Sequence, residues 1–279
     1  MKMHVVKSPQ RVITVVLPAD TTTLVSYRTV LKNFLRMMAG SYKQKLYTNY
    51  ITTHTGLLYD KPTLSIIESN FVVWDNYYKS ILPTDLNLPI LDIGCGNGSF
   101  IYYLHQRGYK NAFGVDLSAE QINEGHKLGI TNIKVQDAIS ALEESNTYHC
   151  IIARDVVEHL TRQEAFDLLL LVSARLVKSG RFIMQVPNGQ GIYFTSIFYG
   201  DYTHEQAYTE SSVSQLFLNT GFSSSFCRPT GPVPHGFVSS VRSLLWKCKV
   251  LVHRFWKAVE TGSGKGIFTS NLIAVGDKL

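Results

Sequence analysis

The glycine-rich stretch at residues 90–100, ILDIGCGNGSF, constrains the fold of this chain more than any other part. It begins with apolar residues that are typical of a short buried strand. Gly94, Gly96 and Gly98 then permit a tight turn, and the apolar stripe after them predicts a helix that ends near Gly108. A strand, a glycine turn and a helix in this order direct unpaired backbone N–H groups and a helix dipole to one point. We therefore expect an anionic group to bind there.

The spacing of these glycines argues against two common nucleotide sites. A dinucleotide-binding turn requires G-x-G-x-x-G, and Ser99 stands where the last glycine would be. No G-K-[ST] sequence follows the turn, so a phosphate-binding P-loop is excluded. An NAD site is disfavoured for the same stretch.

Asp92 and the three glycines form the pattern D-x-G-x-G-x-G, which resembles the first motif of class I S-adenosylmethionine-dependent methyltransferases. In that family the turn holds the methionine end of the cofactor. The resemblance implies that Asp92, Gly94, Gly96 and Gly98 bind S-adenosylmethionine here.

Two further acids follow predicted strands and extend the expected cofactor site. Asp116 lies about 20 residues beyond the glycines, where nucleoside-binding α/β folds place an acid that accepts the ribose hydroxyls. Its neighbour Leu117 is included in the same site. By resemblance to the family, Asp137 accepts from the adenine amino group and Ala138 supplies a backbone contact. The alternative for Asp137 is an N-cap of the helix at 138–143.

Strands and helices alternate from residue 89 to 188, which predicts an α/β fold with a doubly wound parallel sheet. The expected strands are 89–93, 112–116, 132–135, 148–153, 181–186 and 222–227, with a last strand at 267–275. The resemblance implies a Rossmann-like sheet of seven strands, mostly parallel, whose last strand is antiparallel and lies beside the fifth. We expect a basic, helical N-terminal segment at 1–83, with separate helical pieces before and after residues 61–62. The methyltransferase domain should span 84–279, with a helical insertion at about 235–262.

Three residues near the carboxyl ends of predicted strands are candidate catalytic residues. The sulfonium of the cofactor is already an activated methyl donor, so an alcohol acceptor mainly needs positioning and a base. His159 follows the fourth strand and His204 follows the fifth, and both are candidates for that base. Asp155, the third candidate, also follows the fourth strand, at the carboxyl edge of the predicted sheet.

A metal site is an alternative use of the same residues. Asp155, Glu158 and His159 are spaced i, i+3, i+4, which places them on one face if the turn is helical, and His204 could complete the cluster. The pattern resembles the Glu-x-x-Glu-His motif of metal-assisted quinone-biosynthesis and small-RNA 2′-O-methyltransferases, with Asp155 replacing the first Glu. Such a site would hold an ion such as Mg²⁺. The simpler interpretation is an acidic helix start with a hydrogen-bonded histidine.

Segments outside the cofactor motifs, on which the choice of methyl acceptor would depend, resemble those of bacterial methyltransferases of surface-polysaccharide and glycolipid assembly. The resemblance rests on YTNYITTHTG, on GDYTHEQAYTESSVSQLFLNTGF and on GIFTSNLIAVGDK near the C-terminus. It implies O-methylation of a sugar, with a small-molecule or lipid-linked glycan as acceptor. Two alternatives stay open: metal-assisted methylation of a quinone-type or RNA acceptor, and a catalytically silent binding module. The sequence does not determine the oligomeric state.

Charge is distributed unevenly along the chain. Residues 51–240 carry 12 basic and 18 acidic side chains although the net charge is +6, so the flanks are basic. An acidic core disfavours nucleic acid as a partner. Two basic amphipathic helices are expected at 22–38 and 241–259, which could contact an anionic membrane surface, each other, or a partner. Each could also simply present its basic face to water.

The remaining composition favours a cytoplasmic protein. The four cysteines have no C-x-x-C spacing, so neither zinc nor a disulfide framework is indicated. No run of about 18 uncharged apolar residues occurs, and the run at 12–18 is too short for a signal peptide.

Overall fold

The computed structural model describes residues 3–8, 11–16, 46, 62–144 and 146–279, in two units, Met1–Tyr47 and Thr48–Leu279. In the first unit, strands β1 (Met3–Ser8) and β2 (Arg11–Val16) form an antiparallel hairpin, with Met3 opposite Val16. This hairpin was not predicted. The helix expected at 22–38 and, apart from Leu46, the helical piece expected before residues 61–62 lie outside the described residues.

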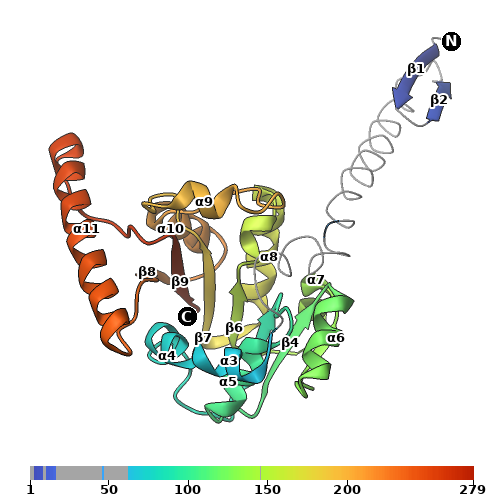
Figure 1. Ribbon diagram of the computed structural model, residues 1–279. Coiled ribbons are helices and arrows are strands. Elements are labelled where there is room, and N and C mark those ends of the chain that lie inside the picture. The colour runs from blue at the N-terminus through green and yellow to red at the C-terminus, as the bar shows by residue number, and fades with distance from the viewer. Residues whose placement is uncertain (1–2, 9–10, 17–45, 47–61, 145) are drawn as a thin grey trace. The chain divides into compact units, whose positions relative to one another are not determined.

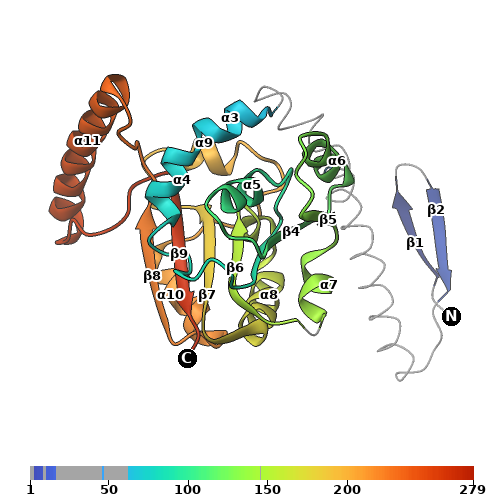
Figure 2. The same cartoon turned by 90° about the horizontal axis from the view of Figure 1, so that it is seen from below.

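The second unit is built on a seven-stranded sheet in the order β5-β4-β3-β6-β7-β9-β8 (Figures 1 and 2). Its strands are β3 (Ile90–Ile93), β4 (Ala112–Asp116), β5 (Ile133–Val135), β6 (Tyr148–Arg154), β7 (Leu176–Pro187), β8 (Ser224–Pro229) and β9 (Asn271–Asp277). The pairs from β5 to β7 are parallel, and β9 is antiparallel to both β7 and β8. The predicted α/β fold, including the antiparallel last strand beside the fifth, is confirmed.

The helices connect these strands on both sides of the sheet. They are α3 (Leu64–Ser69), α4 (Phe71–Tyr78), α5 (Ser99–Gln106), α6 (Ala119–Lys127), α7 (Ala138–Glu143), α8 (Arg162–Arg175), α9 (Phe194–Phe198), α10 (Glu210–Asn219) and α11 (Phe237–Thr261), with a 3₁₀ turn η2 (Val157–His159). Local signals fix their starts. Ser118 caps α6, and Thr161 and Glu164 form a capping box at the start of α8. No helix among the described residues has the length and apolarity needed to cross a membrane.

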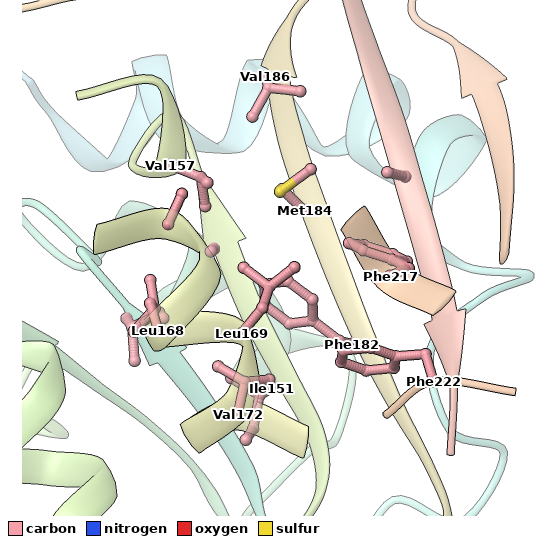
Figure 3. Packing of buried hydrophobic residues seen from close by; sticks show 14 of the residues in the cluster. Ile151, Val157, Leu168, Leu169, Val172, Phe182, Met184, Val186, Phe217 and Phe222 are labelled. Carbon is pink, nitrogen blue, oxygen red and sulfur yellow. The ribbon is translucent and has the colours of Figure 1, made fainter. Parts of the chain in front are cut away.

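Alternate residues of the central strands face two separate cores. Ile151 belongs to the cluster beneath α8, whereas Cys150 and Ile152 belong to the cluster beneath α5. Figure 3 shows Leu168 and Leu169 of the first cluster among side chains of β6 and β7. Burial on both faces explains why the strands are continuously apolar in sequence.

The last strand begins four residues later than expected, and side-chain hydrogen bonds of Asn188 hold the segment before it. The side-chain amide of Asn188 donates to the carbonyl oxygens of Ile267 and Thr269, both at 2.8 Å. Regular pairing between β7 and β9 therefore starts at Pro187 and Asn271.

Candidate active site

The glycine turn after β3 is fastened to the neighbouring strand β4. The backbone N–H groups of Gly94 and Cys95 both donate to the carbonyl oxygen of Val115, at 2.8 and 3.0 Å. The φ angles of Gly94, Gly96 and Gly98 are 70°, 57° and 76°. A Cβ at Gly94 would also lie 2.3 Å from Cγ2 of Val156, so both conformation and space require glycine there.

Asp92 places a buried carboxylate beneath this turn. The residue is 1% exposed, and its Oδ1 has no hydrogen-bond partner among the described residues. Burial raises the pKa of Asp92 to about 7, although the nearby Arg154 opposes the shift. A buried acceptor without a donor is costly, so this oxygen suits a ligand that brings an N–H group.

Asp116 at the end of β4 joins the turn by a direct contact. Its Oδ2 accepts the backbone N–H of Gly96 and its Oδ1 accepts that of Ser118, each at 2.8 Å. Burial raises the pKa of Asp116, and these two donors oppose the rise. Each oxygen keeps acceptor capacity for a hydroxyl of a ligand. The adjacent Leu117 is 63% exposed at the same strand end.

Asp137 serves as the N-cap of α7. One carboxylate oxygen accepts the backbone N–H of Ile139 and the other that of Ser140, both at 3.0 Å. The hydroxyl of Ser140 donates to the second oxygen as well. The capping interpretation is therefore observed, while contacts of Asp137 and Ala138 with adenine stay a prediction.

Arg154 at the end of β6 is a functional candidate that the sequence interpretation missed. Its guanidinium carbon lies 4.4 Å from the ring centre of Phe100, 5.2 Å from Trp74 and 5.6 Å from Tyr78. Its Nε is buried and has no hydrogen-bond partner within the described part of the chain. The cation acts on Asp92 electrostatically. The available signal in the sequence was its place at the carboxyl end of a buried strand.

A second set of side chains gathers around η2. Glu158 and His159 come from this turn, and His204 comes from the loop after α9. Ligand atoms of the three residues all lie within 4.8 Å of one another, and the two imidazole centres are 4.7 Å apart. The backbone N–H groups of Glu205 and Gln206 donate to the carbonyl oxygen of Glu158, at 2.8 and 3.2 Å, which fastens the two loops together.

The hydrogen-bond network assigns the tautomers of both histidines. The hydroxyl of Thr203 donates to Oδ1 of Asp201 at 2.6 Å, so it accepts from Nδ1 of His159 at 2.8 Å. Nδ1 of His204 lies 2.9 Å from the carbonyl oxygen of Phe198. Because a carbonyl oxygen can only accept a hydrogen bond, Nδ1 of His204 carries the proton and donates it. In the neutral rings, Nε2 is therefore the basic nitrogen of each histidine.

Asp155 does not share a helical face with Glu158 and His159. It has a φ of 56° and precedes the 3₁₀ turn, so the i, i+3, i+4 relation of an α-helix does not form. Its exposed carboxylate accepts from Nε2 of Gln185, at 3.0 and 2.9 Å. The observed cluster therefore contains three of the four predicted residues, Glu158, His159 and His204, without Asp155.

Glu158 is the buried carboxyl group of this cluster. It is 1% exposed, and its Oε2 has no hydrogen-bond partner among the residues that the structure describes. Burial, followed by the charge of Asp155, raises the pKa of Glu158 well above its ordinary value. A proton or a cation at this oxygen would remove an expensive buried charge.

Comparison with known proteins identifies the family of this chain. A family model described as a methyltransferase domain matches residues 70–224, more than half of the chain. Probable (S)-tetrahydroprotoberberine N-methyltransferase 2 of Papaver bracteatum is 38% identical over 84 residues, which are 28% of this chain and 23% of that protein. The match thus spans about a quarter of the curated relative's length.

Solved structures show the same fold. A methyltransferase dependent on S-adenosylmethionine from Archaeoglobus fulgidus aligns over 77% of this chain and 95% of its own, with 19% identity and a TM-score of 0.54. Another from Mesorhizobium loti aligns over 74% and 98%, with 15% identity and a TM-score of 0.51. The chain therefore belongs to the methyltransferase-domain family, and it shares its fold with methyltransferases that depend on S-adenosylmethionine.

Proposed function

We propose that the chain transfers a methyl group from S-adenosylmethionine to a hydroxyl of a sugar in a surface glycan or glycolipid, with His204 as the base. The observation that carries this proposal is the pair of imidazoles whose tautomers leave Nε2 basic on both rings. They follow β6 and β7 in the chain, and ligands of open α/β sheets bind outside the carboxyl ends of such strands.

The residues around the glycine turn fit the cofactor. Its methionine end carries an ammonium and a carboxylate, which Asp92 and Arg154 complement with opposite charges. Asp116 offers acceptors for the ribose hydroxyls. When bound, S-adenosylmethionine supplies a methyl group already activated by the sulfonium. The protein then has to align the acceptor oxygen and accept its proton.

A hydroxyl acceptor fits the histidine pair better than an amine does. An amine attacks through its own lone pair, whereas a hydroxyl gains nucleophilicity when a base takes its proton. The curated relative is named as an N-methyltransferase, so an amine acceptor is the competing outcome. His204 is partly exposed and suits contact with an acceptor, while His159 is 9% exposed and is fixed by Thr203. Asp155 stays a predicted catalytic residue beside them.

Exposed tyrosines in the same loop support a sugar. Tyr193, Tyr199 and Tyr202 are 50%, 78% and 86% exposed, in the segment that leads to His204. Large aromatic faces at a surface are suited to packing against the apolar faces of sugar rings.

A second candidate function is metal-assisted O-methylation of a quinone-type or RNA acceptor. The cluster of Glu158, His159 and His204 favours it, since each residue offers a ligand atom within 4.8 Å of the others. Asp201 and Thr203 orient His159 as outer partners of metal-bound histidines do. Two nitrogen ligands favour Mn²⁺, Fe²⁺ or Zn²⁺ over Mg²⁺, which prefers oxygen.

One experiment separates these functions. The purified full chain is incubated with S-adenosylmethionine labelled in its methyl group and with fractionated glycan, glycolipid, quinone and RNA extracts. We expect label on a sugar oxygen, located by mass spectrometry, with turnover unaffected by EDTA. Label on a quinone or RNA that is lost with EDTA and restored by Mn²⁺ would establish the second candidate. Label on nitrogen, or cofactor binding without any transfer, would contradict both.

A further inference from the structure

Helix α11 turns its apolar face away from the protein. Ten large apolar side chains of this helix are between 41% and 85% exposed: Phe237, Val238, Val241, Leu244, Leu245, Leu251, Val252, Phe255, Trp256 and Val259. We call these ten residues the apolar stripe. Figures 1 and 2 both show α11 standing apart from the sheet, on the side of β8. A surface helix of a globular protein normally buries such a face.

The other side of the helix and its basic borders contact the protein. Ser239 and Ser243 are buried. The Lys249 ammonium lies 4.1 Å from the ring centre of Tyr193, and His253 packs edge-on against Phe268 at 4.8 Å. A cavity of about 530 Å³ between the helix and the rest of the unit is lined in part by Lys247, Trp246 and Phe268. These contacts lie on the side of the helix away from the stripe, which faces outward.

The stripe is uninterrupted and bordered by positive charge. On an ideal helix the ten residues fall within an arc of about 140° over a length of about 33 Å, and the one other residue in this arc is Cys248. Arg242 and Lys249 follow one border of the arc, and Lys247 and Arg254 follow the other. The helix carries five Lys or Arg residues and a single acid, Glu260.

We propose that α11 is a membrane-docking helix that lies in the surface of an anionic lipid bilayer, with the apolar stripe inserted and the basic borders at the headgroups. The charges along its borders favour a lipid surface over a second copy of the helix as the partner that covers the stripe. A second copy of α11 would bring one basic border against another, which is repulsive, whereas anionic headgroups complement both borders. Basic side chains beside an apolar face keep their stems in the apolar layer and their charges at the headgroups. The inference does not rest on the acceptor proposed above.

The test measures binding of the full chain to sedimenting vesicles, without cofactor or acceptor. One set is phosphatidylcholine alone, and the other contains about one third phosphatidylglycerol. We expect binding to the anionic set that weakens as salt is raised. The doubly substituted Arg242→Gln, Lys247→Gln chain should bind about 25-fold more weakly, at about fivefold for each charge removed. Leu244→Glu with Leu251→Glu should abolish binding.

Matched controls keep the test informative. Leu170 and Leu218 are exposed on α8 and α10, so their replacement by Glu introduces the same charges away from the stripe and should leave vesicle binding intact. Melting curves of every variant monitor the fold. Equal binding of the wild type and the Leu244→Glu, Leu251→Glu variant would overturn the proposal. Failure of the wild-type chain to bind either vesicle set would also overturn it. If light scattering shows that the wild type is a dimer and that the Leu244→Glu, Leu251→Glu variant is a monomer, the stripe is the interface with a second copy instead.

Because this readout contains no methyl-transfer step, its failure is distinguishable from failure of the proposed function. A chain that methylates a sugar but does not bind vesicles would refute only the docking helix. A chain that binds vesicles but transfers no methyl group would refute only the acceptor assignment.

Discussion

Gly96 donates its backbone N–H to Oδ2 of Asp116 at 2.8 Å, so the glycine turn after β3 and the acid at the end of β4 are one structural unit. The contact spans 20 residues of sequence and holds the turn while the carboxylate keeps capacity for a ligand. The acid therefore has two functions, one in shaping the turn and one in the proposed contact with ribose.

Asp116→Ala removes both functions. We expect the affinity for S-adenosylmethionine to fall by about 1–3 kcal/mol, or about 5- to 150-fold, because charge-assisted hydrogen bonds are lost. Isothermal titration calorimetry measures this change. Asp167→Ala on the exposed side of α8 is the control, and it should bind as the wild type does. Unchanged affinity of the Asp116→Ala chain would remove this residue from the cofactor site.

Asp92 predicts a pH dependence of cofactor binding. Burial raises the pKa of Asp92 to about 7, so the carboxyl in the free protein is increasingly protonated below that pH. The ammonium of the cofactor pairs with the ionised form. Affinity should therefore rise with pH up to about 7 and then level off, with a slope approaching about tenfold per pH unit below the pKa. Titrations between about pH 5.5 and 8.5 test this slope, which Asp92→Asn should flatten.

The raised pKa of Asp92 also predicts how the stability of the free protein depends on pH. A carboxyl whose folded pKa exceeds its unfolded value contributes stability below the unfolded pKa, and this contribution is lost as pH rises toward about 7. Asp92→Asn should therefore weaken the decline of the melting temperature between about pH 4 and 7. An identical decline in both proteins would show that Asp92 titrates normally in the folded chain.

His204→Gln should lower turnover by about 10²- to 10⁴-fold and leave cofactor affinity within about twofold, because the base acts on the acceptor. Steady-state kinetics and calorimetry on the same preparation separate the two effects. His126→Gln on α6, whose ring contacts the carbonyl oxygen of Ile133, is the control with normal turnover. Equal loss of affinity and turnover in His204→Gln would indicate a structural role.

Glu158→Gln distinguishes a metal ligand from a buried acid. If the cluster binds a metal, Mn²⁺ should raise the melting temperature of the wild type, and the variant should lose this shift because one charged ligand is gone. Without a metal, added Mn²⁺ should leave both melting curves unchanged. Glu124→Gln, in an exposed ion pair with Lys127, is the control.

Much of the fold could be predicted because its signals are local. The glycine turn, the apolar strands and the caps of α6 and α8 depend on residues a few positions apart. The hairpin of β1 and β2 was missed although Arg11–Val16 is rich in β-branched residues, because the short run was weighed only as a signal peptide. The late start of β9 depends on Asn188, which lies about 80 residues away in sequence.

The sequence by itself indicated the class of protein, because Asp92 and its three glycines resemble the first motif of class I S-adenosylmethionine-dependent methyltransferases and Asp116 ends the next predicted strand. Only the tertiary structure decided how the chemistry is arranged. The backbone conformation at Asp155 takes this residue out of the cluster, and contacts across 44 residues set the tautomer of His159. The tertiary structure likewise shows that α11 turns its apolar face outward. Amphipathic periodicity fixes which residues share a face, but partners distant in sequence determine which face is buried.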